Sequence, residues 1–160
     1  MSGTDLHPNA ARVQDALTRA GAEGSVRQLD ESTATSADAA VALGVEVAQI
    51  GKSLVFLGDD RAVVIVLSGA DRLDTGALAR FLGVGSVRRP DAQEVRFSTG
   101  YPIGGVSPLG LPQGVPVLID EGLAGFDVIW VAAGTPNAVF PTTYEELIRI
   151  APARPGRFRT

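Results

Sequence analysis

One lysine stands out among the residues of this chain that could do chemistry. The chain has 14 basic residues, and Lys52 is the only one that is not arginine. A lysine ammonium binds phosphate, carboxylate or carbonyl oxygen as a compact point charge, whereas the arginine guanidinium is a planar fork. Arginine-favouring coding bias would also produce this count. Lys52 starts an apolar run after Gly51, so an exposed lysine that protects a strand edge is the alternative interpretation.

The residues that most often carry nucleophilic or metal chemistry are absent or isolated. The chain has no cysteine and a single histidine, His7, which excludes a thiolate nucleophile, disulfides and a cysteine-ligated metal. Ser53 and Ser107 have no histidine placed nearby in the sequence, which argues against a serine hydrolase. We therefore expect no metal and no cofactor, and a site that acts by positioning its substrate.

A long segment rich in glycine and proline, 98–114, lies between two well-patterned parts of the chain. Gly104 and Gly105 permit positive φ and a close approach of a ligand to the backbone. Successive N–H groups in such a loop can bind an anion or a polarised ester oxygen. Pro102 and Pro108 stiffen the segment, and long loops inside compact domains are usually functional. An ordinary surface loop is the alternative, and no Walker A motif is present.

A third segment, 132–137, directly follows an apolar run. Its small residues and Gly134 suit the wall of a pocket, to which Thr135 or Asn137 could add polar contacts. Turn chemistry alone explains the Thr-Pro-Asn sequence equally well.

The remaining charges indicate little bulk attraction to nucleic acid. The net charge is −4, which argues against a protein that coats nucleic acid. The residues 149–160 contain arginines and no acid; they could touch phosphate, but a frayed terminus is the expectation. Acidic residues in the predicted turns are expected to be solvated: Asp59, Asp60, Asp120 and Glu121.

The elements that must position these residues follow an α+β pattern. Helical spacing and capping residues predict helices over 9–20, 39–43, 75–82 and 144–150, with one or two turns over 91–97. Apolar runs predict strands over 25–29, 52–57, 62–67, 86–89, 115–119, 126–132 and 138–140.

These strands are joined mostly by short connections. The turn at 58–60 makes 52–57 and 62–67 an antiparallel hairpin, and the connection 120–125 is too short for a crossover helix. Pro152 and Pro155 are expected to end regular structure. We expect one domain over residues 1–160, with a mixed, largely antiparallel, barrel-like sheet of about six or seven strands surrounded by helices. No apolar run suits a membrane span or a signal peptide, so a cytoplasmic protein without a membrane partner is expected.

Three stretches, taken in order, resemble the YbaK-like family of aminoacyl-tRNA deacylases, which includes freestanding relatives of the bacterial prolyl-tRNA synthetase editing domain. They are 49–56 (QIGKSLVF), 99–110 (TGYPIGGVSPLG) and 131–137 (VAAGTPN). The resemblance runs from about Glu46 to Ile150. It implies a hydrolase that clears mischarged amino acids from the 3′ end of tRNA, with aminoacyl-tRNA as its partner and an aminoacyl-tRNA synthetase as a further one.

The resemblance also assigns roles to individual residues. Lys52 matches the family's functional lysine, which engages the terminal adenosine and its phosphate. Gly104 and Pro108 match a Gly-x-x-x-Pro loop that shapes the amino-acid pocket, and Gly134 matches the glycine of a later pocket loop. Ala132 departs from the family, because several relatives have serine there. The expected catalytic residues are Lys52, Gly104 and Gly105, and the expected substrate-binding residues are Ser107, Pro108, Gly134 and Thr135.

The implied reaction suits this composition. An aminoacyl ester is already activated, and the adjacent ribose hydroxyl can help to position water, so neither cysteine, histidine nor metal is needed. Cysteine or alanine on proline tRNA is the substrate expected by analogy, in a pocket whose volume Leu57, Val64 and Ile103 would set. Two alternatives stay open: a non-catalytic module that binds a tRNA end, a nucleotide or a synthetase, and a small-molecule esterase that is indifferent to the tRNA body.

Overall fold

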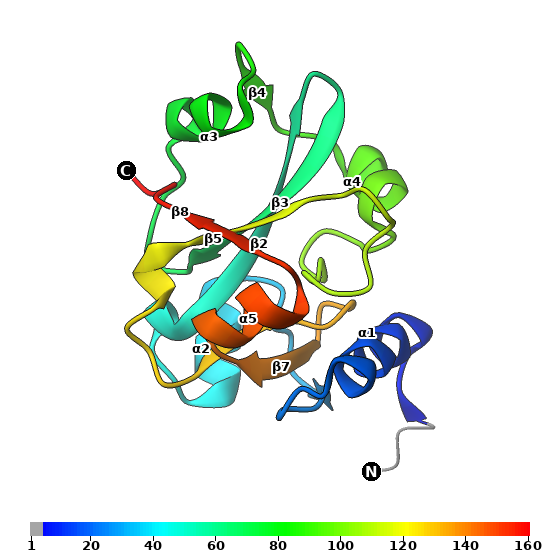
Figure 1. The fold of residues 1–160 in the computed structure, drawn as a ribbon. Coiled ribbons are helices and arrows are strands. Elements are labelled where there is room, and N and C mark those ends of the chain that lie inside the picture. Colours follow the sequence, from blue (N-terminus) through cyan, green and yellow to red (C-terminus); the bar gives the residue numbers. More distant parts are fainter. Residues whose placement is uncertain (1–4) are drawn as a thin grey trace.

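A long β-hairpin forms the centre of the fold (Figure 1). The computed structural model describes residues 5–160, in which β2 (Ile50–Gly58) and β3 (Arg61–Ser68) pair antiparallel along their whole length. Asp59 and Asp60 form the two-residue turn, and both have positive φ, 50° and 61°. Two-residue hairpin turns favour this geometry, and aspartate tolerates it. The predicted hairpin is confirmed.

The other strands extend the sheet on both sides of this hairpin. The order is β1-β7-β6-β2-β3-β5-β8, and β4 pairs with β2 outside this path. Four strand pairs are antiparallel and three are parallel. The α+β class and the mixed, mostly antiparallel sheet are therefore confirmed, with eight strands in a sheet that stays open rather than closing into a barrel. The bounds are β1 Arg27–Gln28, β4 Val87–Arg88, β5 Val117–Asp120, β6 Ile129–Ala132, β7 Ala138–Thr142 and β8 Arg154–Gly156.

Helices pack around the sheet, and their ends follow local capping rules. Thr35, Asp74, Asp91 and Thr143 each accept a hydrogen bond from a first-turn N–H, which satisfies a donor that the helix itself leaves free. In Figure 1, α3 and α4 lie toward the turn end of the hairpin, and α2 and α5 toward the opposite end. The bounds are α1 Pro8–Ala20, α2 Ser36–Leu43, α3 Thr75–Leu82, α4 Ala92–Thr99 and α5 Tyr144–Ile150, with the short 3-10 helices η2 Val47–Gln49 and η3 Glu121–Leu123.

The two faces of the hairpin carry separate apolar clusters. Val64 and Val66 belong to the larger cluster, which α1, α5 and the 100–110 loop complete. Ile65 belongs to the smaller cluster, with Leu78 of α3 and Phe158 near the C-terminus. Successive strand residues point to opposite faces, so a hairpin covered on both sides is apolar at nearly every position. This burial holds β2 and β3 in a single register.

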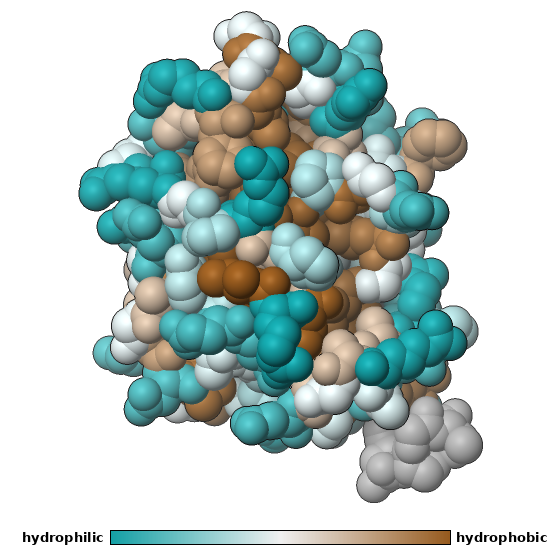
Figure 2. All heavy atoms as spheres, in the orientation of Figure 1, coloured by the Kyte–Doolittle hydropathy of each residue, from teal (hydrophilic) through white to brown (hydrophobic). Residues whose placement is uncertain are grey.

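Polar side chains cover much of the surface that Figure 2 shows, with apolar ones gathered toward the middle of that face. Phe97 and Val41 are the most exposed of the large apolar residues, at 89% and 84%, and they belong to different helices. None of the helices in residues 5–160 has the length and apolarity that crossing a bilayer requires.

The prediction that regular structure ends at Pro152 is wrong. Strand β8 follows it and pairs parallel with β5, and Phe158 beyond β8 is buried against the smaller cluster.

The expected solvation of Asp120 is also wrong, because its side chain is fully buried. Its carboxylate accepts hydrogen bonds from the N–H groups of Gly122, Phe158 and Arg159 and from the Arg159 guanidinium. The tail thus covers an edge strand that would otherwise be open.

The short connection after β5 does not make β5 and β6 neighbours. β5 pairs with β3, whereas β6 pairs with β2, so the two strands lie on opposite sides of the central hairpin. Residues 121–123 form η3, within the connection that crosses the open end of the hairpin. β5 runs parallel to β3, and β6 runs parallel to β2. Because β2 and β3 are antiparallel, β5 and β6 run in opposite directions, and a short connection can join them across the open end of the hairpin.

Candidate active site

A cavity of about 260 Å³ lies where β2 and β6 separate. These two strands run parallel and pair only at Ile50–Trp130 and Gly51–Val131. Crevices of this kind between diverging strands are common ligand sites. Segments far apart in the sequence line the cavity: residues 33–36, 50–54 and 130–132, together with Ala39, Ile103, Gly104, Val106 and Val139.

The close approach of β2 to β6 depends on Gly51. A Cβ atom at this position would lie 2.8 Å from Cγ1 of Val131 and 3.0 Å from Cγ1 of Val66. Both distances are shorter than carbon atoms tolerate without movement. Gly51 therefore lets the strands touch immediately before Lys52, so that the lysine stands at the point where they part.

Lys52 is half-buried, and its Nζ donates to the carbonyl oxygen of Asp71 at 2.6 Å. Burial lowers the pKa of Lys52 from its usual 10.5; the negative charge of Asp71 opposes this shift, and the nearby Arg72 adds to it. Lys52 is only partly exposed and its ammonium is hydrogen-bonded to the backbone, which differs from the solvent-exposed lysine of the alternative interpretation. A partly desolvated ammonium attracts an anion more strongly than a solvated one.

The start of α2 borders the same cavity through Thr35 and Ser36. The first N–H groups of a helix lack partners within it and carry partial positive charge. Gly69 packs against this helix start, because a Cβ there would lie 2.7 Å from Cβ of Ser36. Lys52 and this helix start thus line the same cavity, and Gly69 lies two residues before Asp71, whose carbonyl accepts the Lys52 ammonium. The sequence identified Thr35 and Ser36 as capping residues only, and no local signal linked them to Lys52.

Gly104 reaches the cavity from a tight turn. The Gly105 N–H donates to the Pro102 carbonyl at 3.0 Å, and Gly104 has a φ of +85°, as the third residue of a type II turn requires. A Cβ at Gly104 would also lie 3.0 Å from Cβ of Ala34. This hydrogen bond uses the N–H group of Gly105. The N–H groups of Ile103 and Gly104 take no part in it.

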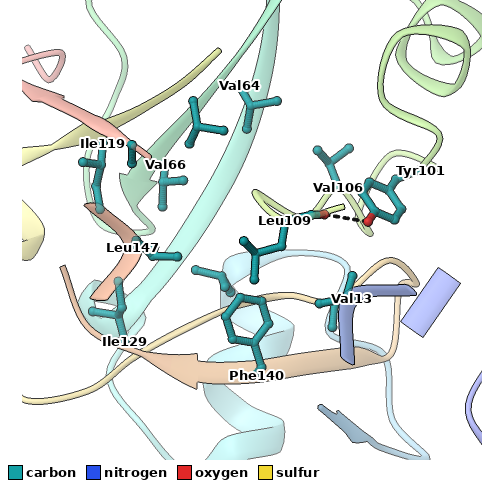
Figure 3. Packing of buried hydrophobic residues seen from close by; sticks show 14 of the residues in the cluster. Val13, Val64, Val66, Tyr101, Val106, Leu109, Ile119, Ile129, Phe140 and Leu147 are labelled. Atoms are coloured by element: carbon teal, nitrogen blue, oxygen red, sulfur yellow. Dashed lines mark hydrogen bonds between the residues drawn. The ribbon is translucent and has the colours of Figure 1, made fainter. Parts of the chain in front are cut away.

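The rest of this loop is largely buried and is held by internal hydrogen bonds. Figure 3 shows the Tyr101 hydroxyl donating to the Leu109 carbonyl, at 2.6 Å, and Leu109 packs in the larger cluster with Val13 of α1. Ser107 and Pro108 are buried in the loop rather than in the cavity lining. The Ser107 hydroxyl accepts the Leu109 N–H at 3.3 Å. The structure therefore places these two residues in the buried part of the loop, outside the cavity lining.

Gly134 and Thr135 lie beside the same loop but border a different hollow. The Gly134 N–H donates to the Gly105 carbonyl at 2.9 Å, and a Cβ on Gly105 would lie 2.9 Å from the Thr135 backbone. Asn9 donates to the Gly134 carbonyl at 3.0 Å. Both residues line a separate hollow of about 720 Å³ that also includes His7. The structure thus places Lys52 and Gly104 on one cavity and leaves Gly105, Gly134 and Thr135 outside its lining.

Ser53 contributes an unexpected polar group to the cavity. Its Oγ is the single buried side-chain polar atom of residues 5–160 that has no hydrogen-bond partner, and the residue lines the cavity. A buried hydroxyl without a partner costs free energy unless a ligand supplies one. The sequence raised Ser53 only as a nucleophile without a base, and a serine next to a lysine carries no signal for a ligand contact.

Other wall residues set the size of the cavity. Ile103, which is 60% exposed, stands at its rim, and Ala132 and Trp130 line it from β6. The expectation that Leu57 and Val64 help to set its volume is wrong, because neither lines it; Val64 is fully buried in the larger cluster. Residues 5–160 contain no group of three or more acidic or histidine side chains arranged to hold a metal ion.

Comparisons with known proteins identify the family to which this site belongs. The sequence pattern of the aminoacyl-tRNA editing domain matches residues 30–150, which include every segment that lines the cavity. This chain belongs to the aminoacyl-tRNA editing domain family. The family is associated with editing and deacylation of aminoacyl-tRNA, in agreement with the resemblance noted in the sequence.

Individual relatives support this membership. The chain is 33% identical over 136 residues to the uncharacterized protein YwhH of Bacillus subtilis, covering 84% of this chain and 86% of YwhH. It is 34% identical over 96 residues to EbsC of Enterococcus faecalis, named as a candidate Cys-tRNA(Pro)/Cys-tRNA(Cys) deacylase, covering 59% of this chain and 58% of EbsC. A crystal structure of a candidate trans-editing enzyme for prolyl tRNA synthetase is 41% identical, with a TM-score of 0.90, covering 98% of this chain and 99% of that one.

Proposed function

We propose that this protein is a freestanding hydrolase that deacylates mischarged aminoacyl-tRNA, with cysteine or alanine on proline tRNA as its substrate class. One observation carries the proposal: the half-buried Lys52, the start of α2 and the Gly104 turn all line one small cavity. Two of these groups favour an anion and the third presents backbone to a ligand. This combination suits the 3′ end of a charged tRNA, which joins a phosphate, a ribose and an ester.

Lys52 is the proposed anchor for the last phosphate of the tRNA. An ammonium has three N–H donors, so Lys52 keeps its hydrogen bond to the Asp71 carbonyl while it donates to phosphate. The N–H groups at the start of α2 add to the attraction, as helix starts do in other phosphate sites. Because few phosphates need to be held, a net charge of −4 is compatible with this substrate.

The reaction requires positioning rather than a nucleophilic side chain. A water molecule attacks the ester carbonyl carbon, the bond to the ribose oxygen breaks, and that oxygen takes up a proton as the amino acid leaves. In this proposal the N–H groups of Ile103 and Gly104, which the hydrogen bond of the turn does not use, stabilise charge on the carbonyl oxygen. The unpartnered Ser53 hydroxyl is available to the substrate, and the adjacent ribose hydroxyl orients the water.

The size of the cavity favours a small amino acid. A volume of about 260 Å³ is below the usual range of about 300–1,000 Å³ for ligand pockets. Cysteine and alanine have small side chains, and the name of EbsC refers to Cys-tRNA. The name of the trans-editing relative also makes prolyl-tRNA synthetase the partner to test first.

A deacylation screen over a panel of correctly and wrongly charged tRNAs tests the proposal. We expect release of cysteine or alanine from proline tRNA, and a loss of about 100-fold in Lys52→Ala, because one preorganised charge contributes on this scale. Lys52→Arg should also lose activity, since a planar fork does not replace a point charge. Arg61→Ala removes an exposed positive charge from the far end of the same hairpin and should leave the rate unchanged.

The outcomes separate the alternatives. If no charged tRNA loses its amino acid, or if Lys52→Ala acts as fast as the wild type, the proposed hydrolysis is wrong. Binding of tRNA or of a synthetase without turnover would favour the non-catalytic module. Turnover of simple aminoacyl esters at the same rate as aminoacyl-tRNA would favour a small-molecule esterase.

A further inference from the structure

The C-terminal tail, residues 157–160, runs beside the segment 71–74. The Asp74 N–H donates to the Phe158 carbonyl at 2.7 Å, and the Thr160 N–H donates to the Arg72 carbonyl at 2.9 Å. Leu73 and Arg159 form an antiparallel bridge between these two hydrogen bonds. In Figure 1 the chain ends beside the connection that leads into α3. The tail therefore acts as a short strand partner for a segment that otherwise has none in the sheet.

Asp120 holds this tail in place from the end of β5. Its Oδ1 accepts the N–H groups of Phe158 at 2.6 Å and Arg159 at 3.2 Å. Its Oδ2 accepts the Arg159 guanidinium at 2.7 Å. The carboxylate is completely buried, and a buried charge of this kind requires its partner. Arg159 and Asp120 thus form the fixed end of the tail.

The segment that the tail holds is also the segment that holds Lys52. Asp71, its first residue, supplies the carbonyl oxygen that accepts the Lys52 ammonium at 2.6 Å. The Asp71 side chain lies near Arg159 as well: a Cβ on Gly122 would lie 3.2 Å from Nη1 of Arg159 and 3.4 Å from Oδ2 of Asp71. A continuous set of contacts therefore leads from Asp120 through the tail to the ammonium of Lys52, a residue that lines the cavity.

We propose that Arg159 is a positioning residue for Lys52: its ion pair with Asp120 fixes the tail, and the tail fixes the 71–74 segment whose carbonyl directs the ammonium to the cavity. This inference rests on the proposed function for its effect on rate, but not for its effect on Lys52 itself. Because Arg159 lies outside the cavity lining, it acts only through the contacts described above.

The single lysine of the chain permits a direct test without any substrate. Protein labelled with ¹³C-lysine gives one side-chain Cε resonance, whose pH titration reports the pKa of Lys52. Burial lowers this pKa below 10.5, with Asp71 raising it and Arg72 lowering it. In Arg159→Met we expect the resonance to move and its pKa to rise toward 10.5 as the segment loosens and the ammonium gains water. Arg157→Met, which removes an exposed charge two residues earlier, should match the wild type.

Rates of deacylation give a second readout. Arg159→Met should lower the rate about tenfold, since small misplacements of binding groups have effects of this order, and Arg159→Lys should recover part of the loss. In a Lys52→Ala background, Arg159→Met should have no further effect, because the residue acts through Lys52. A residue that only supports the fold would lower the rate by the same factor in both backgrounds.

The failures are distinguishable. If folded Arg159→Met keeps the wild-type Lys52 resonance and pKa, the positioning role is wrong whatever the enzyme activity. If the wild type has no deacylase activity but the resonance moves as expected, the proposed function fails and the positioning role stands. Should Arg159→Met not fold, deletion of Thr160 decides: it removes the hydrogen bond to the Arg72 carbonyl, and an unchanged Lys52 resonance would overturn the inference.

Discussion

The basic side chains at the two ends of the β2–β3 hairpin differ in their burial and in their partners. At the turn end, Arg88 of β4 pairs with Glu94 at 2.7 Å and with Asp60 at 3.8 Å; the Arg88 and Asp60 side chains are largely exposed, and Glu94 is partly exposed. At the open end, Lys52 is half-buried, and its hydrogen-bond acceptor is a carbonyl oxygen. Lys52 takes part in none of the ion pairs of residues 5–160.

The charge of Arg88 is therefore paired with carboxylates within the protein, whereas the ammonium of Lys52 is hydrogen-bonded to an uncharged carbonyl group. Exposed ion pairs exchange water for a partner at little net gain. A partly buried ammonium without a carboxylate partner costs free energy, and an anionic ligand would recover that cost. Under the proposed function the open end of the hairpin binds substrate, whereas the charges at the turn end stabilise local structure.

The largest expected effect on stability comes from filling the close contact at the open end. Gly51→Ala would place Cβ 2.8 Å from Val131 and 3.0 Å from Val66. We expect a loss of about 1–3 kcal/mol in the free energy of unfolding from overpacking. A fall of about tenfold in deacylation should accompany it as β2 and β6 move apart beside Lys52. Urea unfolding and a deacylation assay measure the two effects.

Gly58, at the turn end of the same strand, is the matched control. A Cβ there would lie 3.3–3.5 Å from the side chains of Val84, Leu82 and Val87, which can shift by a few tenths of an ångström. Gly58→Ala should change stability by less than about 1 kcal/mol and leave deacylation unchanged. Equal losses in the two variants would show that the open end has no special role.

The next effect is a dependence of activity on pH. In the proposed function Lys52 anchors phosphate as an ammonium, and burial lowers its pKa below 10.5. The rate, corrected for spontaneous ester hydrolysis, should be constant below this pKa and fall about tenfold per pH unit above it. A rate that stays constant up to pH 10.5 would contradict the role of the charge.

Stability should change in the opposite sense over the same range. The folded-state pKa of Lys52 is lower than the unfolded one, so between the two values the unfolded chain binds more protons. The free energy of unfolding therefore rises with pH through this window. Lys52→Met should lack this rise, which chemical unfolding at a series of pH values would detect.

The smallest effect is expected at the turn end. Arg88→Met removes an exposed ion pair, so Tm at pH 7 should fall only slightly and deacylation should stay within about twofold of the wild type. The Arg88 hydrogen bond is the main cause that lowers the pKa of Glu94 from 4.5 to about 2. The Tm difference should therefore vanish as pH falls from 4.5 to about 2, and a difference that persists at pH 2 would contradict this cause.

Elements specified by neighbouring residues were predictable from the sequence. The Asp59-Asp60 turn, the caps at Thr35 and Asp74 and the apolar runs of β2 and β3 each depend on contacts within a few residues. The candidate site was predictable in part, because Lys52 and Gly104 stood out by type, and the structure places both on one cavity. The Ser53 hydroxyl gave no such signal, because its lack of a partner exists only after the strands pack.

Tertiary structure decided the rest, and the reason is the range of the interactions involved. Residues 154–160 look like a frayed end because their partners, β5 and the segment 71–74, are distant in the sequence. In the sequence Asp120 resembles an exposed turn residue, because its ion-pair partner Arg159 is 39 residues away along the chain. The sequence by itself determined that a lone lysine and a glycine turn were available for chemistry. Only the packing of distant segments decided that the lysine is half-buried beside a cavity, and which residues hold it there.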